Sequence, residues 1–314
     1  MTEENKEKSE ELCEKFLINE DSNPDDTIEL LKKIKNLSKN EAVAILNYLA
    51  GKASNPKVLL YLVQMIGKYK DRSSVEVLIE ILTDYKKPEE QEKYQKIRCT
   101  TAAILGEIRD DRAVVPLMYI MNDKNEYYKI RLSTAEALGK IGNIYAVNPL
   151  INIVTDEEEK SVYLRESAAK ALGMIGDERA VDPLISIIET KKGLLDKFTF
   201  LKEKTVEALG KLVFNQEKKL NTLKFTLLDE SPHIRISTME ALCEIDDDII
   251  LSLIEPMIYD KDENVARSAV NALYNLQGRD FVLELPERYE LPDWCKEEID
   301  EILEEDEEEG EDDE

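Results

Sequence analysis

The sequence predicts an all-α fold made of stacked, antiparallel helix pairs. A segment that starts at Lys129, KIRLSTAEALGKIGNIYAVNPLINIV, returns 34 residues later as YLRESAAKALGMIGDERAVDPLISII. Its apolar residues recur with the spacing of a helix that buries one face. The composition, with 42% apolar, only 6% aromatic and 35% charged residues, is typical of exposed helical surface around small aliphatic cores. A unit this short cannot bury its own apolar face, so neighbouring units must stack into a solenoid.

An arginine and a glycine, eight residues apart, set the register of the repeats. Three copies keep both residues, and these are Arg98 with Gly106, Arg131 with Gly139, and Arg165 with Gly173. Degenerate copies before and after them bring the array to about six to seven units. In each unit we expect the glycine to end the first helix, where a left-handed residue is favoured. We expect Pro116, Pro149 and Pro183 to lie in the first turn of the second helix.

The turn and the proline recur in phase in three segments, GEIRDDRAVVPLM, GKIGNIYAVNPLI and GMIGDERAVDPLI, and each segment begins eight residues after the repeated arginine. These segments resemble HEAT repeats of the subclass named after phycobilisome lyases. The resemblance covers roughly residues 57–277 and implies a HEAT-like α-solenoid. Because the subclass includes scaffolds, adaptors and a few enzymes, the resemblance indicates the fold and not the activity.

The chain divides into four segments. Residues 1–56 are predicted to form divergent helices that cap one end of the array, and residues 57–280 form the repeats. Residues 281–303 cap the other end, since a terminal repeat would otherwise expose an apolar face. Trp294, the only tryptophan, serves either this cap or a docking motif for a partner. Residues 304–314 form a disordered acidic tail.

Two repeats carry insertions, at residues 84–95 and 189–200. Both follow a second helix, so we expect them on the same edge of the solenoid. The first insertion is polar. The second contains Leu194, Leu195, Phe198 and Phe200, which form a patch for a partner or extend a helix that packs its phenylalanines into the core.

Negative charge is concentrated at the C-terminus. Fourteen acidic residues and no basic one follow from Glu297 onward, which is over half of the net charge of −26. Like charges at this density repel, so we expect disorder beyond Leu303. The tail either attracts a basic protein electrostatically or serves only solubility.

This charge balance argues against binding to nucleic acid or to anionic membranes. Affinity for phosphates depends on Lys and Arg, and the longest basic runs here are pairs such as Lys218-Lys219. No apolar stretch approaches the length of a membrane span, and the first residues lack the apolar core of a signal peptide. We therefore expect protein partners, and the more specific prediction is that the partner is a basic protein. The oligomeric state is left open.

Four cysteines, Cys13, Cys99, Cys243 and Cys295, lie far apart and form no CxxC pair. This pattern predicts neither a zinc site nor a redox dithiol, and it is typical of free thiols in a reducing compartment. The expected location is the cytoplasm.

No catalytic, metal-binding or cofactor-binding residue is predicted. Deoxyhypusine hydroxylase, a HEAT-repeat enzyme family, holds two irons with His-Glu pairs, but this chain has a single histidine, His233, which is followed by Ile234. Bilin lyases share the repeat resemblance, and their chemistry leaves no short motif that maps onto this sequence. A lyase-like, cofactor-modifying accessory protein therefore stays as the alternative function.

Four arginines occupy one position in successive repeats, namely Arg98, Arg131, Arg165 and Arg235. They form either a phosphate-binding ladder or a structural ladder. We favour the structural ladder, in which each arginine meets acids or loop carbonyls of adjoining repeats and fixes the stacking angle.

The candidate protein-binding groove follows from the register of the second helices, which we expect to line the concave side. Positions that break the apolar pattern of these helices are Val115, Tyr119, Asn148, Asn152, Asp182 and Ser186. Tyr119 is the expected anchor, because aromatic residues concentrate binding energy. The predicted function is a non-catalytic interaction scaffold or adaptor, with chaperoning of a basic client by the acidic tail as its more specific version.

Overall fold

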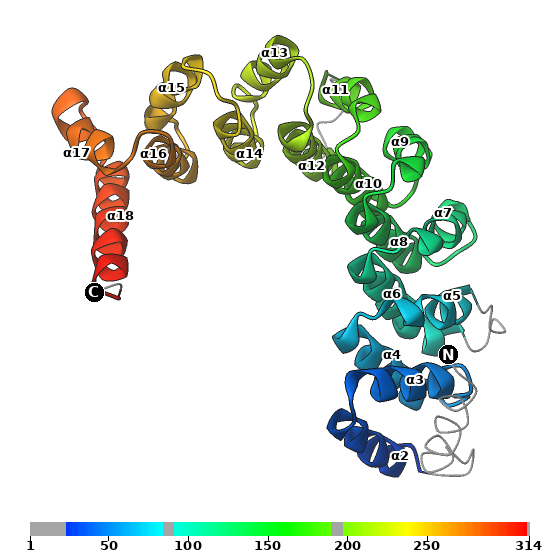
Figure 1. Ribbon diagram of the computed structural model, residues 1–314. Coiled ribbons are helices and arrows are strands. Elements are labelled where there is room, and N and C mark those ends of the chain that lie inside the picture. Colours follow the sequence, from blue (N-terminus) through cyan, green and yellow to red (C-terminus); the bar gives the residue numbers. More distant parts are fainter. Residues whose placement is uncertain (1–22, 84–90, 190–196, 313–314) are drawn as a thin grey trace. The chain divides into compact units, whose positions relative to one another are not determined.

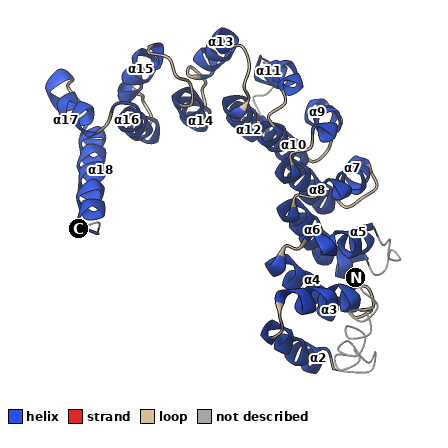
Figure 2. Cartoon of the chain, in the orientation of Figure 1, coloured by secondary structure: helices blue, strands red, loops and turns tan. Residues whose placement is uncertain are grey.

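The computed structural model describes residues 23–83, 91–189 and 197–312. Within these ranges every regular element is a helix and none is a strand (Figure 2). Consecutive helices form pairs, and within each of the two compact units described below successive pairs pack on one another (Figure 1). The fold is therefore a HEAT-like α-solenoid, as the sequence predicts.

Each repeat has a long first helix and a shorter second helix. The first helices are α4 (Pro56–Tyr69), α6 (Gln91–Ile108), α8 (Tyr128–Ile141), α10 (Val162–Ile175), α12 (Lys197–Lys211), α14 (Pro232–Cys243) and α16 (Glu263–Gln277). The second helices are α5 (Val75–Thr83), α7 (Val114–Asn122), α9 (Val147–Thr155), α11 (Val181–Glu189), α13 (Gln216–Thr226) and α15 (Ile249–Ile254). Short 3₁₀ turns adjoin five of the second helices, and they are η2 (Arg72–Ser74), η4 (Asp111–Ala113), η5 (Ile144–Ala146), η6 (Glu178–Ala180) and η7 (Glu255–Tyr259).

Further helices flank the array at both ends. The N-terminal ones are α2 (Pro24–Leu31), η1 (Lys32–Asn36) and α3 (Lys39–Ala50), and the C-terminal ones are α17 (Arg279–Arg288) and α18 (Asp293–Asp312). Helices α2 and α3 pack on α4, while α17 and α18 pack on α16. The terminal repeats thus have neighbours that cover their apolar faces.

The chain forms two compact units, residues 1–171 and 172–314. The boundary falls inside α10. Each unit has its own core of Leu, Ile, Val and Ala side chains from both helices of its repeats. In unit 1, Leu117, Ile120 and Leu150 are fully buried, and Leu184 is fully buried in unit 2.

The turn between the two helices of a repeat is built by one local hydrogen bond in three successive repeats. The side-chain oxygens of Asp110, Asn143 and Asp177 accept from the backbone N–H two residues later, at 3.1, 2.9 and 3.0 Å. The first helices before these turns end at left-handed residues, and in two repeats these are Gly142 and Gly176, with φ of 78° and 80°. Local sequence therefore determines where each first helix stops.

The glycine that marks the repeat lies inside the first helix, which corrects the expectation that it ends the helix. A Cβ added to Gly106 would lie 2.7 Å from the Cα of Ala137 on α8. Gly173 approaches Ala208 on α12 equally closely, at 2.7 Å for the same atoms. Such contacts leave no room for a side chain, so this glycine allows neighbouring first helices to pack closely.

The first helices form the tightly packed layer of each unit. In unit 1, α6 lies along α8 with extensive contact, whereas α5 touches α7 at only a few residues. In unit 2, α14 packs on both α12 and α16. The closely spaced layer of a curved stack lies on its inner side, so within each unit the second helices form the outer layer (Figure 1). This arrangement corrects the expectation that the second helices line the concave side.

Helix α18 continues to Asp312, where the sequence predicts a disordered tail from residue 304. Cys295, Ile299 and Ile302 are buried and anchor the start of this helix on its neighbours. Once a helix is nucleated by packing, further residues join at little cost, and Glu is a good helix former. The expectation of disorder is thus corrected for residues 304–312, while residues 313–314 lie outside the described ranges.

Candidate functional site

The predicted groove residues lie on the exposed faces of second helices. Val115 and Tyr119 of α7 are 69% and 68% exposed. Asn148 and Asn152 of α9 are also exposed, and these four residues belong to unit 1. The two remaining ones, Asp182 and Ser186, are exposed on α11 in unit 2.

Unit 1 has a shallow groove between α7 and α9, with a volume of about 500 Å³. Its lining residues are Val115, Met118, Tyr119, Asn122, Asp123 and Pro149. Two of the predicted residues, Val115 and Tyr119, thus meet in one groove, whereas Asn148 and Asn152 lie on the neighbouring helix face outside its lining. The groove is mostly apolar and carries one charged side chain, that of Asp123.

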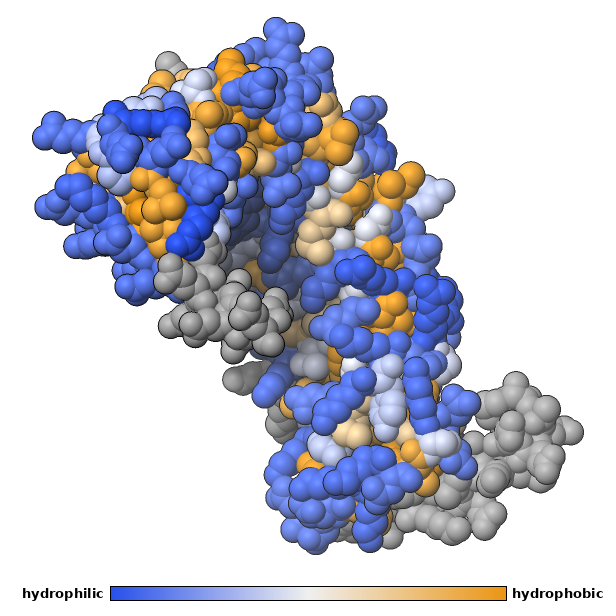
Figure 3. Space-filling model, turned by 60° about the vertical axis from the view of Figure 1, so that its left-hand side comes forward, coloured by the Kyte–Doolittle hydropathy of each residue, from blue (hydrophilic) through white to orange (hydrophobic). Residues whose placement is uncertain are grey.

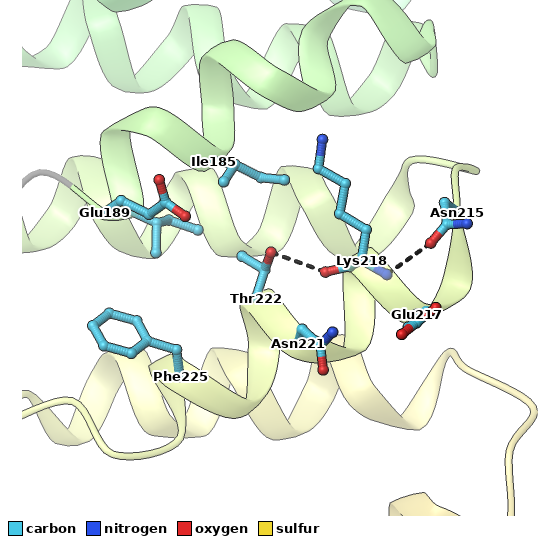
Figure 4. A pocket seen from close by; sticks show the side chains of 9 residues that line it. Ile185, Glu189, Asn215, Glu217, Lys218, Asn221, Thr222 and Phe225 are labelled. Carbon is cyan, nitrogen blue, oxygen red and sulfur yellow. Dashed lines mark hydrogen bonds between the residues drawn. The ribbon is translucent and has the colours of Figure 1, made fainter.

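Unit 2 has a groove between α11 and α13, with a volume of about 550 Å³ (Figure 4). Helix α11 contributes Ile185, Ile188 and Glu189, and the lining from α13 and its N-cap is Asn215, Glu217, Lys218, Asn221, Thr222 and Phe225. Neither Asp182 nor Ser186 lines the groove. Asp182 instead forms an ion pair with Lys218, and the Ser186 hydroxyl donates to the Pro183 carbonyl oxygen at 2.7 Å.

The sequence did not indicate the α13 side of this groove, because the repeat that contains α13 lacks the proline that sets the register. Its N-cap is Asn215, whose side chain accepts from the Lys218 N–H at 2.8 Å. A signal was nevertheless present in the sequence. Glu217, Asn221 and Phe225 are spaced four residues apart, so they lie on one face of α13. All three fall outside the positions that the apolar pattern assigns to the core, and all three are exposed.

The second insertion adjoins this groove in the sequence. Its residues 190–196, with Leu194 and Leu195, lie outside the described ranges, as do residues 84–90 of the first insertion. Phe200, which belongs to α12, is 55% exposed and so does not pack into the core. Figure 3 shows apolar surface in separate patches among hydrophilic residues, without one continuous apolar area on that face.

The repeated arginines of unit 1 are buried and join successive elements. Arg98 donates from Nε to the Leu82 carbonyl oxygen of α5 at 2.7 Å, and from its guanidinium to Glu126 Oε2 at 2.6 Å. Arg131 repeats the arrangement with the Met121 carbonyl at 2.9 Å and Glu159 Oε2 at 2.7 Å. Each arginine thus ties the end of the preceding second helix to the loop before the next first helix.

Electrostatics at the Arg131 site reflect this pairing. Burial is the largest single influence on the pKa of Glu159 and acts to raise it. The hydrogen bonds from Arg131 and from the Ser161 N–H, together with the charge of Arg131, outweigh burial and leave the pKa below its ordinary value. Arg165 donates to the Val154 carbonyl oxygen at 3.0 Å, and burial lowers the pKa of its guanidinium. These side chains are 5–7% exposed and face neighbouring elements, which leaves no accessible ladder of cations for a phosphate.

Unit 2 keeps the same kind of contact with altered residues. Arg235 of α14 makes a bidentate pair with Asp260, at 2.8 and 2.5 Å, and also donates to the Asp229 carbonyl oxygen at 2.8 Å. In α12 the corresponding position is Lys202, which pairs with the Asp229 carboxylate. Sequence reasoning missed Lys202, although its distance of eight residues from Gly210 matches the spacing of the arginines.

Carboxylates also gather on the first helices of unit 2. Glu203 and Glu207 of α12 both pair with Lys204. Burial, followed by the nearby Glu207 charge, raises the pKa of Glu240 on α14. Among the described residues no three His, Cys, Asp or Glu side chains converge as a metal-binding group would require. In the same ranges no helix combines the length and apolarity that a membrane crossing needs.

Comparison with protein families agrees with the repeat architecture. The family model described as HEAT repeats matches residues 90–162 and 126–197. These residues carry HEAT repeats. They contain the three regular copies of the arginine and glycine signature, and the groove between α7 and α9. No curated protein matches the chain.

Solved structures with similar folds differ in their named activities. Human deoxyhypusine hydroxylase is 16% identical, with a TM-score of 0.35, over 88% of this chain and 98% of that one. The complex of CpcE and CpcF of phycocyanin lyase from Nostoc sp. PCC7120 is 18% identical, with a TM-score of 0.45, over 84% and 94%. Kap121p bound to Nup53p is 14% identical, with a TM-score of 0.47, over 87% of this chain and 34% of that one.

Proposed function

We propose that this protein is a non-catalytic scaffold or adaptor that binds other proteins through the exposed faces of its second helices. The observation that supports this most directly is the groove of unit 1, in which Val115 and Tyr119 remain 69% and 68% exposed. Large apolar side chains gathered in a groove favour a protein interface, and tyrosine is enriched among residues that dominate binding energy.

A basic protein is the proposed partner. The net charge of −26 creates a field that attracts cationic surfaces and repels nucleic acid and anionic lipid. The acidic C-terminal segment would raise the encounter rate and, in the more specific form of the proposal, chaperone the client. Free thiols at Cys99, Cys243 and Cys295 are compatible with a reducing compartment, and the proposed location is the cytoplasm.

The alternative is a lyase-like accessory protein that modifies or carries a cofactor. It rests on the resemblance of the repeats to the phycobilisome lyase subclass of HEAT repeats, to which we propose these repeats belong. On the side of the second helices in unit 1, Tyr119 of α7 and Tyr145 of η5 are exposed and would offer aromatic rings to a planar ligand. Absorbance titration of the purified protein with a linear tetrapyrrole distinguishes the alternative, because a shifted and saturable spectrum would favour it over a scaffold.

Site-specific photo-crosslinking tests the scaffold proposal. A benzophenone amino acid replaces Tyr119 in the native host, and a matched variant carries it at Tyr163, which is 65% exposed on α10 in the layer of first helices. We expect one discrete protein adduct at position 119 and none at position 163. No protein adduct at position 119, or the same adduct at both positions, would contradict the proposal.

A further inference from the structure

We propose that the groove between α11 and α13 binds an extended, basic peptide segment whose two cationic side chains flank one apolar side chain. This inference rests on the proposed function and specifies the partner chemistry of a second site. It concerns unit 2 only, so its test is independent of the test of the groove that contains Tyr119.

The floor of the groove is apolar. Ile185 and Ile188 of α11 are 7% and 2% exposed, and both line the groove. The small part of each side chain that is not buried forms the floor. Phe225 of α13 is 57% exposed, and its ring lies across the groove from α11 (Figure 4). A ring with this exposure offers apolar contact area that a partner side chain would cover.

The charges of the groove do not cancel. Lys218 is paired with Asp182 and therefore contributes no net positive charge. Within the described residues, neither Glu189 nor Glu217 has an ion-pair partner. Two carboxylates thus remain available on a chain that is already strongly negative, and this combination selects for a cationic ligand.

The two carboxylates lie toward opposite ends of the groove. In Figure 4, Glu189 lies near the end that contains Phe225, and Glu217 lies near the other end. Eight residues separate Glu217 from Phe225 along α13, which corresponds to about 12 Å of helix. An extended peptide covers that distance in about four residues at roughly 3.3 Å each.

This spacing predicts a sequence pattern in the ligand. Residues i, i+2 and i+4 of an extended chain project from the same side. Basic residues at i and i+4 would reach the two carboxylates, and an apolar residue at i+2 would cover the floor between them. Asn221, whose side-chain amide has no hydrogen-bond partner in the described structure, supplies both a donor and an acceptor for the peptide backbone.

Fluorescence anisotropy with defined peptides tests the pattern on the full-length protein. The probe is a fluorescein-labelled peptide with Arg-Ser-Leu-Ser-Arg at the centre of a Gly-Ser sequence. A control peptide of the same composition, with Ser-Arg-Leu-Arg-Ser at its centre, turns its arginines to the opposite side from the leucine. We expect saturable binding of the probe, and binding at least about 3-fold weaker for the control.

Protein variants locate the binding in the groove. We expect Glu189→Gln, Glu217→Gln and Phe225→Ala each to weaken binding of the probe about 3- to 5-fold. Glu287→Gln, which removes an exposed carboxylate of α17 elsewhere in unit 2, is the matched control and should change affinity less than 2-fold. Circular dichroism melts verify that each variant remains folded.

Three outcomes would overturn the proposal. The first is equal affinity for the two peptides, and the second is an equal loss of affinity in Glu287→Gln and the groove variants. The third is no binding of the probe up to about 1 mM, which corresponds to a standard free energy of only about −4 kcal/mol. If a protein adduct still forms at position 119, the scaffold proposal survives each of these outcomes.

Discussion

The grooves of the two units occupy equivalent places between neighbouring second helices, yet they differ in charge. The groove of unit 1 is lined by Val115, Tyr119 and neutral neighbours, with Asp123 as its one charged residue. The groove of unit 2 contains Glu189, Glu217 and Lys218. The layer of first helices is built similarly in both units, so the difference in charge between the grooves comes from the side chains that the second helices expose.

The same comparison applies to the contacts that hold the repeats together. Unit 1 uses Arg98 and Arg131, each with one carbonyl oxygen and one carboxylate from flanking elements. Unit 2 keeps the contact but substitutes Lys202 at one position and uses Asp260 for Arg235. Ion pairs that are buried or partly buried are thus retained in both units, while the solvent-facing groups change.

The largest expected effect comes from Arg131→Ala. Removing one partner of a buried pair leaves the Glu159 carboxylate, 7% exposed, without its guanidinium, and this should lower the free energy of unfolding by about 3–5 kcal/mol. Chemical denaturation checks this loss. Arg179→Ala is the control, because its ion pair with Asp177 is 45% exposed on the arginine side and should matter by less than about 1 kcal/mol. Equal losses in the two variants would show that burial does not distinguish these pairs.

Gly106→Ala should destabilise unit 1 by about 1–3 kcal/mol. The added methyl group would lie 2.7 Å from the Ala137 Cα, and this overpacking exceeds the roughly 1 kcal/mol that alanine gains over glycine within a helix. Thermal unfolding followed by circular dichroism measures the effect. Gly51→Ala is a useful comparison, because its nearest contact would be 3.6 Å and its φ is negative. A rise in the melting temperature of Gly106→Ala would contradict close packing as the role of this glycine.

Removal of residues 305–314 should affect binding kinetics rather than stability. The truncation must keep Ile299 and Ile302, because both side chains are buried. At low salt we expect the association rate of the arginine probe to fall several-fold, since the missing acids attract cations over a distance comparable to the Debye length. In stopped-flow measurements at about 0.5 M salt, the full-length and the truncated protein should bind the peptide at the same association rate. An unchanged rate at low salt would assign the tail to solubility alone.

The smallest expected effect is that of Glu240→Gln in unit 2. Glu240 is an exposed residue, but partial desolvation of its carboxyl and the charge of Glu207 raise its pKa, so the folded state holds this proton more tightly than the unfolded state does. Its ionisation therefore lowers stability as the pH rises above the ordinary value of 4.5, through the raised pKa. The variant should raise Tm by less than about 2 °C at pH 7. This gain should vanish below pH 4, and a gain that persists there would exclude the ionisation as its cause.

The core positions and the phase of the repeats could be predicted from the sequence, but the surface of the functional site could be predicted only partly. Leu117, Ile120 and Leu150 follow the helical period and are fully buried. Val115 and Tyr119 break that period, and they line a groove, while binding of a protein there stays a prediction. The groove of unit 2 was missed because α13 lacks the proline that aligns the other second helices.

The sequence by itself determined that the chain forms helix pairs, where their turns lie and which faces are buried, because the helical period and the turn-forming residues act over a few neighbouring positions. Only the tertiary structure decided which layer of helices packs closely and which exposed side chains meet in a groove. Those features depend on contacts between helices about thirty residues apart, such as that of Gly106 with Ala137. Because helices pack so closely, a single added methyl group changes the distance between two of them. The spacing of apolar residues within one helix does not predict that distance.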